Sequence, residues 1–161
     1  MVRFAVIMFL AFVAMEFVSY LAHRYVYHTF LWILHKSHHA PRKGLFEWND
    51  LFPTFFASIA ILLMWYAVGD PSRNDILALT LGVTMYGLVY FVIHDLYAHR
   101  RMKSLSFRIP YLQQVKKAHM VHHQTGGEPY GLLLFTTPRR VREAAPDVPL
   151  DATAPEQLPR K

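Results

Sequence analysis

The sequence contains no cysteine, and this absence excludes several chemistries at once. Without thiols the chain forms no disulfide, holds no iron–sulfur cluster and offers no thiolate to a metal or a substrate. Any bound metal must therefore be held by nitrogen and oxygen ligands. Charge is scarce as well, because 17% of the 161 residues are charged and 53% are hydrophobic. Soluble domains carry about 25% charged residues.

The apolar residues are concentrated in three long blocks, Val2 to Ala22, Leu51 to Gly69 and Ile76 to Ile93. Each block is long enough to cross the roughly 30 Å hydrocarbon core of a bilayer. We therefore predict an all-α polytopic membrane protein with three transmembrane helices, or four if one block is split. Residues 1–142 are expected to form one integral-membrane domain. Residues 143–161 are rich in Ala and Pro without an apolar period, which predicts a disordered tail.

The apolar blocks contain no histidine, yet the chain has ten, all in four short motifs that follow a repeated spacing. Two motifs are triplets at positions i, i+3 and i+4, a spacing that places three imidazoles on one face of a helix. The other two motifs are pairs with four residues between them. Neutral imidazole is the commonest metal ligand in proteins, so we predict that all ten histidines are catalytic metal ligands: His23, His28, His35, His38, His39, His94, His99, His119, His122 and His123.

The spacing favours two metal ions over one. A single metal rarely takes all three histidines of such a triplet, whereas two metals a few ångströms apart can share it. Residues five apart point about 140° away from each other on an ideal α-helix. We therefore expect the pairs His23/His28 and His94/His99 to lie where a helix leaves the bilayer and frays or overwinds.

Other metal sites fit the sequence less well. Ten histidines are too many for one structural zinc site, which needs four ligands. Carboxylates are too scarce near the motifs for a Glu-x-x-His di-iron bundle, and the His-Glu-x-x-His protease motif is absent. A bis-histidine haem needs isolated histidines within the apolar blocks, which have none. Imidazole suits iron and zinc equally, so zinc could replace iron in purified samples.

Three polar residues beside the motifs are candidates for orienting the ligands. Asp95 could fix the tautomer of a neighbouring imidazole or form an ion pair with Arg100 or Arg101. Asn49 and Asp50 could act in the same way, or could cap the helix that starts at Leu51. Glu16 is costly inside a span and indicates either a functional or a packing role. Tyr90, Phe91 and Tyr97 could wall a substrate channel or could be interfacial aromatics.

Topology supports one shared compartment for the histidines. With three crossings, all ten lie on the same side of the membrane, together with fifteen of the 17 lysines and arginines. The positive-inside rule makes that side cytoplasmic and places the N-terminus outside. The net charge of +6 is then explained by membrane orientation, and we expect no nucleic-acid partner.

The four motifs resemble those of the membrane-bound fatty-acid hydroxylase and desaturase superfamily of non-haem di-iron enzymes. The residues between them resemble the bacterial β-carotene 3-hydroxylase branch, from about Glu16 to Phe135: Trp32 before His35-Lys-Ser-His-His39, Pro41-Arg-Lys-Gly44 followed by Glu47 and Asn49-Asp50-Leu51, Met85-Tyr-Gly-Leu88, Tyr90-Phe91, His94-Asp95 and Ala118-His119. Gly126-Gly127-Glu128-Pro129-Tyr130 stands where that branch usually has a cysteine-containing stretch.

The resemblance implies a monooxygenase of the bacterial inner membrane with two irons. It would use O2 and electrons from a ferredoxin-type donor to add a hydroxyl at C3 of the β-ionone rings of β-carotene, giving zeaxanthin. The alternatives are a fatty-acid or sterol hydroxylase, a desaturase or a carotenoid ketolase of the same superfamily. A membrane metal transporter is a further alternative, although transport predicts ligands along a path within the spans. The sequence does not indicate an oligomeric state.

Overall fold

The computed structural model describes residues 1–42, 44–101 and 109–134, and every regular element within these ranges is helical. In chain order the elements are α1 (Val2–Ala22), η1 (His23–Tyr27), α2 (Trp32–His35), η2 (Trp48–Asp50), α3 (Leu51–Ala67), η3 (Pro71–Arg73), α4 (Asn74–Tyr90), η4 (Phe91–Ala98) and α5 (Pro110–Thr125). Three continuous helical stretches are long and apolar enough to cross a membrane: Val2–Tyr27, Trp48–Ala67 and Pro71–Ala98. The predicted all-α fold with three spans is confirmed. The predicted tail, 143–161, lies outside the described residues.

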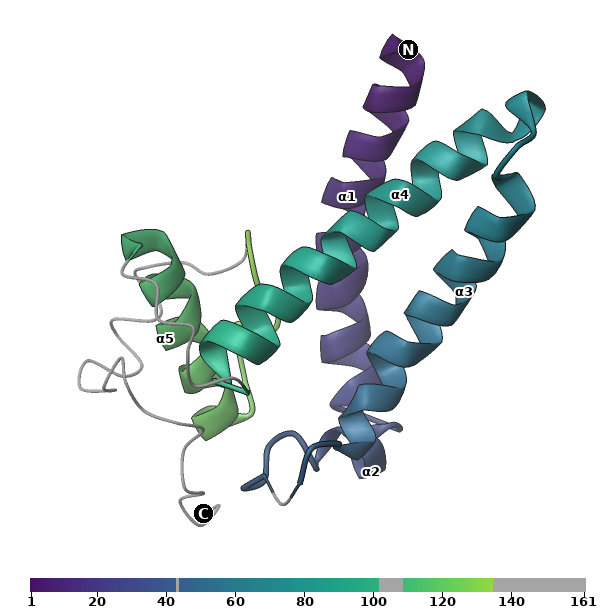
Figure 1. Ribbon diagram of the computed structural model, residues 1–161. Coiled ribbons are helices and arrows are strands. Elements are labelled where there is room, and N and C mark those ends of the chain that lie inside the picture. The colour runs from purple at the N-terminus through teal and green to yellow at the C-terminus, as the bar shows by residue number, and fades with distance from the viewer. Residues whose placement is uncertain (43, 102–108, 135–161) are drawn as a thin grey trace.

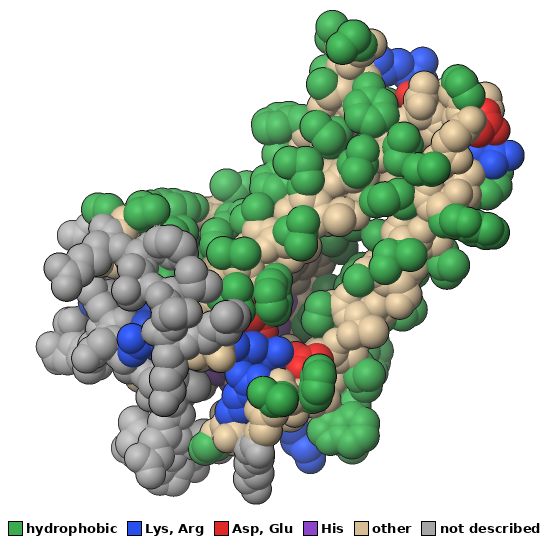
Figure 2. Space-filling model, viewed as in Figure 1, with side chains coloured by type: hydrophobic (Ala, Val, Ile, Leu, Met, Phe, Trp, Pro, Cys, Tyr) green, Lys and Arg blue, Asp and Glu red, His purple; other side chains and the backbone are tan. Residues whose placement is uncertain are grey.

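The three spanning helices are arranged so that one end of the molecule gathers the short elements. Helices α3 and α4 form a hairpin around η3, and α1 packs along α4 (Figure 1). The N-terminus and η3 lie at the same end, where Arg3 pairs with Asp75. Helices α2 and α5 lie at the opposite end. Apolar side chains cover the visible surface of the spans, and charged ones gather at their two ends (Figure 2), as expected for helices in lipid.

Gly82 allows α1 and α4 to cross at close range. A Cβ atom at this position would lie 2.2 Å from the carbonyl oxygen of Met8 and 2.8 Å from the Cβ of Ala11. The first obstacle is backbone, so it cannot move aside as a side chain could. Small residues at helix contacts are the usual means of close packing in membranes, where apolar burial alone gives helices little reason to associate.

We expect Gly82→Ala to lower the melting temperature of the protein in detergent, because overpacking a contact typically costs about 1–3 kcal/mol. Gly87→Ala is the matched control in the same helix, since a Cβ there meets no atom within 4 Å. That control should leave the melting temperature unchanged or raise it slightly, because alanine is the better helix former. Equal melting temperatures for the two variants would show that the crossing is not tight.

Helices α1 and α4 both continue into a π-helix at the end where the histidines lie. The amide of His28 donates to the carbonyl of His23 at 3.1 Å, and the amide of His99 donates to that of His94 at 2.9 Å. These i to i+5 bonds underwind the helix and bring residues five apart onto one side. The expectation of fraying or overwinding was therefore wrong in direction. Underwinding is what allows each pair to face one centre.

Candidate metal centre

The four histidine motifs reach one region from four different elements. The second triplet lies on α5, which begins with Pro110 and ends at Thr125, and the next residue, Gly126, has the left-handed conformation that closes many helices. The first triplet is helical only as far as His35, because α2 ends there and a turn follows. Pro41 restricts the residue before it and prevents the helix from continuing. His38 and His39 therefore point inward from a turn.

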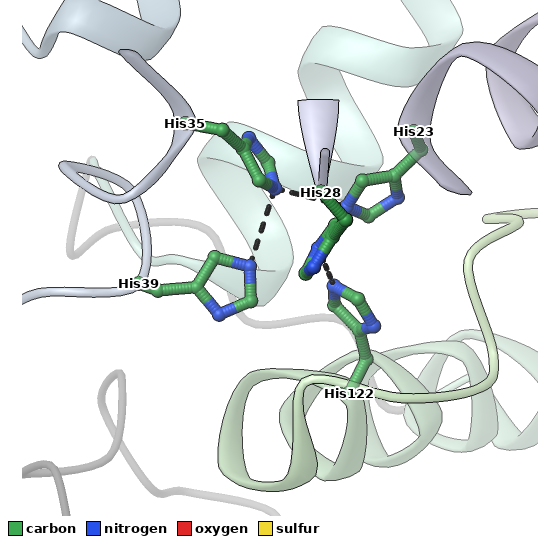
Figure 3. Close-up of side chains that lie close together, drawn as sticks. All are labelled: His23, His28, His35, His39 and His122. Atoms are coloured by element: carbon green, nitrogen blue, oxygen red, sulfur yellow. Dashed lines mark hydrogen bonds between the residues drawn. The ribbon is translucent and has the colours of Figure 1, made fainter. Parts of the chain in front are cut away.

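The first group of facing imidazoles takes one or two residues from each of three motifs. It consists of His23, His28, His35, His39 and His122, each of which offers a nitrogen within 4.8 Å of the others. Their rings converge from η1 and the residue after it, from α2 and the turn after it, and from α5 (Figure 3). The Nε2 atoms of His23 and His35 are 3.0 Å apart, and those of His28 and His122 are 3.1 Å apart.

The second group lies beside the first and consists of His38, His99, His119 and His123. Its Nε2 atoms are also close, at 2.7 Å between His99 and His119. The ring centroids of His39 and His123, one from each group, are 4.3 Å apart. Each triplet is thus divided between the two groups, as the spacing indicated. His94 belongs to neither group of facing nitrogens, but its Nε2 lies 3.1 Å from that of His38.

The outer nitrogens of five imidazoles face hydrogen-bond acceptors. The Nδ1–H of His23 donates to the carbonyl of Tyr130 at 2.7 Å, and that of His122 donates to the carbonyl of Gly127 at 2.5 Å. The other three partners are side chains: Asn49 Oδ1 for His35 at 2.7 Å, Glu47 Oε2 for His38 at 3.2 Å, and Asp95 Oδ2 for His94 at 3.2 Å. An outward Nδ1–H leaves the inward Nε2 of a neutral imidazole with a lone pair.

Lone pairs that face each other need a cation between them. His23 and His35 both have an outward Nδ1–H, so the two Nε2 atoms 3.0 Å apart present two acceptors and no proton. His38 and His94 repeat this arrangement at 3.1 Å. Two nitrogens bound to one metal at about 2.1 Å lie roughly 3–3.5 Å apart. The residues therefore fit metal ions, and each group can hold one.

Asp95 makes both of the contacts considered for it. One oxygen accepts from His94, and the other accepts from Arg101 Nε at 2.9 Å. Arg101 also pairs with Asp50, and it lies 3.8 Å from Glu47. This guanidinium thus connects the carboxylates that orient His38 and His94.

Asn49 and Asp50 have different roles. Asn49 accepts a hydrogen bond from His35 and so orients this imidazole, whereas its place beside a metal ligand stays a prediction. Asp50 makes no side-chain cap bond to α3, but it forms a capping box with Glu47 at η2, the turn that leads into α3. Its carboxylate accepts from the amide of Glu47 at 3.0 Å and from Arg101, so among the described contacts it reaches the histidines through other residues.

The three aromatic residues at the end of the third span are not equivalent. Tyr90 stacks on the ring of His94, with 4.7 Å between centroids. Phe91 is 45% exposed on the outer surface, and Tyr97 is buried. Tyr90 thus stacks on a candidate ligand and is placed to shape the centre.

Burial favours the uncharged form of six imidazoles that lie outside the spans. Burial lowers the pKa of His35 to about 4, against the Asn49 hydrogen bond, and it lowers the pKa of His122 to about 4. Burial, reinforced by the neighbouring imidazoles, lowers the pKa of His39 to about 2. Burial also places the pKa values of His38, His119 and His123 well below the ordinary value of 6.5. Metal binding requires neutral imidazole, so the site is ready for metal at neutral pH.

We expect the metal-free protein to lose stability as the pH falls from about 6.5 to about 4. Above pH 6.5, His35 and His122 are neutral in both the folded and the unfolded chain. Below pH 6.5 the two imidazoles bind protons in the unfolded chain but stay neutral in the folded chain. The free energy of unfolding therefore falls by about 1.4 kcal/mol per group for each pH unit. The melting temperature in detergent, compared at pH 7 and pH 5, checks this. A melting temperature that rises on acidification would contradict it.

Several contacts of the centre could not be found from the sequence. The carbonyls of Tyr130 and Gly127 carry no signal, because every residue has one. Arg101 and Glu47 had a weak signal, as charged residues close to Asp95 and Asn49. The geometry brings all ten predicted histidines together, whereas their ligation of metal stays a prediction.

Comparisons with known proteins agree with this geometry. The fatty acid hydroxylase family model matches residues 8–138. The β-carotene hydroxylase of Pseudescherichia vulneris is 41% identical over 124 residues, which are 76% of this chain and 69% of that protein. That of Pantoea ananas is 41% identical over 128 residues, 77% of this chain and 70% of that protein. β-Carotene 3-hydroxylase 2 of Arabidopsis thaliana, a chloroplastic protein, is 41% identical over 136 residues, 81% of this chain and 44% of the plant protein.

No solved structure matches the chain. The family model covers most of the chain and all ten histidines, and the relatives are named as hydroxylases. The protein is therefore an enzyme with histidine groups that can hold metal, and it belongs to the fatty acid hydroxylase family.

Proposed function

We propose that this enzyme is a carotenoid 3-hydroxylase, which converts β-carotene to zeaxanthin at two histidine-held iron ions. The observation that carries the proposal is the pair of facing imidazole groups at one end of three spanning helices. Identity of 41% to two bacterial β-carotene hydroxylases supports the choice of substrate over fatty acids and sterols.

We assign one iron to each group of facing nitrogens. His23, His28, His35, His39 and His122 would hold the first, and His38, His99, His119 and His123 would hold the second, with His94 beside it. When bound, the two irons would supply the activation of O2 that hydroxylation of an unreactive C–H bond requires. The residues of the chain fix the imidazole tautomers through Asn49, Glu47 and Asp95.

The position of the centre suits a substrate dissolved in the bilayer. His23 and His94 lie at the ends of two spanning stretches, and both are almost fully buried. A long polyene can stay in the hydrocarbon and present its ring at the interface, so it needs no aqueous binding step. Burial of the imidazoles also excludes bulk water from the reacting end of the substrate.

The membrane orientation and the electron donor belong to the same proposal. With the N-terminus outside, the centre faces the cytoplasm of a bacterial cell, where a ferredoxin-type protein can reach it. Lys36 and Arg42 are exposed at this end, and fifteen of the 17 basic residues fall on this side. Such a surface attracts an acidic redox partner.

Expression in a bacterial host that accumulates β-carotene tests the proposed function. We expect new pigments with the retention time and mass of the mono- and dihydroxylated carotenoids. Host cells carrying His122→Ala serve as the negative control. Unchanged β-carotene, with iron-loaded protein present in the membrane and a ferredoxin supplied, would exclude this substrate and favour an acyl or sterol hydroxylase, a desaturase or a ketolase. Flux of metal into vesicles would instead indicate a transporter.

A further inference from the structure

Glu16 lies within the first spanning helix and is 1% exposed, yet it does not contact the histidine centre. Four hydrogen-bond donors surround its carboxylate. Oε1 accepts the backbone amides of Leu132, Leu133 and Leu134 at 3.0, 2.7 and 3.0 Å. Oε2 accepts the hydroxyl of Tyr86 at 2.8 Å. A carboxylate that meets only donors acts as a pure acceptor.

The three amides belong to a non-helical segment at membrane depth. Glu16 precedes His23 by seven residues, which is about 10 Å along the helix toward the bilayer interior. Residues 132–134 follow α5 and run back beside the spanning helices (Figure 1). Irregular backbone in hydrocarbon has no water to bond, and each unsatisfied amide costs several kcal/mol. One carboxylate satisfies three consecutive amides here.

The same segment supplies contacts to the centre. The carbonyl of Tyr130 accepts from His23, and that of Gly127 accepts from His122. Between them, Glu128 accepts from Tyr20 at 2.8 Å and pairs with Arg24 at 2.7 Å. The segment is therefore fastened to the first span at two levels, by Glu128 near the interface and by Glu16 deeper in the bilayer.

We propose that Glu16 is a positioning residue: it anchors residues 132–134 inside the membrane and so holds the Tyr130 carbonyl against His23. The anchored segment acts as a re-entrant wall of the centre. This inference needs a metal ion on His23 but neither a carotenoid nor hydroxylation, so its failure is distinguishable from failure of the proposed function.

The absence of cysteine makes the depth of the segment directly measurable, since a single introduced cysteine is the only thiol. Leu134 is 60% exposed on the segment. We expect a membrane-impermeant maleimide, applied to permeabilised membranes, to label Leu134→Cys about tenfold or more slowly than a surface thiol, because maleimide reacts with the hydrated thiolate. Leu45→Cys gives the fast reference rate, because Leu45 lies outside the spans and is 79% exposed. Ile61→Cys gives the slow reference rate, because Ile61 is 65% exposed but lies within the span that contains α3.

Glu16→Ala should raise the labelling of Leu134→Cys toward the rate at Leu45→Cys and leave Ile61→Cys slow. Glu16→Gln keeps an oxygen that can accept the three amides, so it should keep Leu134→Cys slow. Fast labelling of Leu134→Cys with Glu16 intact would overturn the inference without any Glu16 variant. Labelling that stays slow in Glu16→Ala would overturn it as well.

The link to His23 has its own readout. The absorption spectrum of the cobalt(II)-loaded protein reports the arrangement of the metal's ligands. We expect Glu16→Ala to shift this spectrum and Tyr86→Phe to leave it unchanged, since that control removes the hydroxyl on Oε2 and keeps the three amides on Oε1. An identical spectrum for Glu16→Ala and wild type would remove Glu16 from the positioning of His23.

Discussion

We expect His38→Ala and His122→Ala each to abolish hydroxylation, with a loss of more than about 100-fold in product per enzyme, beyond the 10–100-fold typical of residues that only support ligands. His122 belongs to the first group of facing nitrogens, and His38 belongs to the second. Removing the Nε2 of either residue leaves a metal with one nitrogen fewer and opens a cavity beside buried imidazoles. Product analysis in β-carotene-accumulating cells measures the activity, and elemental analysis of the purified protein measures the metal.

The metal content makes this prediction specific. Each variant should lose one of the two proposed irons preferentially, because the two residues belong to different groups. Gln124→Ala is the matched control, because Gln124 is exposed and directly follows the second triplet. This control should retain activity and metal. Full activity in either histidine variant would remove that residue from the ligands.

We expect the second large loss of activity from Arg101→Ala, although the described ion pairs of Arg101 join it to carboxylates and not to histidines. Its guanidinium pairs with Asp50 and Asp95 and lies near Glu47, and these carboxylates are largely buried. Without the cation, three carboxylates repel one another, and two of them hold His38 and His94. We expect a loss of activity and of metal affinity of about 10–100-fold, the range for residues that orient metal ligands.

Several variants separate this effect from a general loss of packing. Arg101→Lys keeps the charge but not the forked geometry, so it should restore only part of the activity. Arg42→Ala removes a cation that, among the described ion pairs, reaches Glu47 alone at 3.8 Å, so it should have a small effect. Asp95→Asn keeps one acceptor for His94 and should be milder than Arg101→Ala. Metal affinity, measured by competition with a chelator, should follow the same order, and unchanged affinity in Arg101→Ala would refute this role.

Composition and spacing were enough to predict the spans and the candidate ligands. Apolar length and the distribution of charge are properties of continuous stretches, so three spans could be read directly. The repeated triplets and pairs identified ten histidines, and the structure brings all ten together. Asn49 and Asp95 were found for the same reason, since each is close in sequence to a histidine motif.

Tertiary structure decided what local sequence could not. The division of each triplet between two groups depends on where α5 and the turn after α2 lie relative to each other. The tautomer of His23 depends on a carbonyl 107 residues away, and the three amides that Glu16 binds lie more than 100 residues further along the chain. Every residue has a carbonyl and nearly every one an amide, so their partners follow from packing and not from residue type. The underwinding of η1 and η4 is likewise selected by the contacts that the two pairs make.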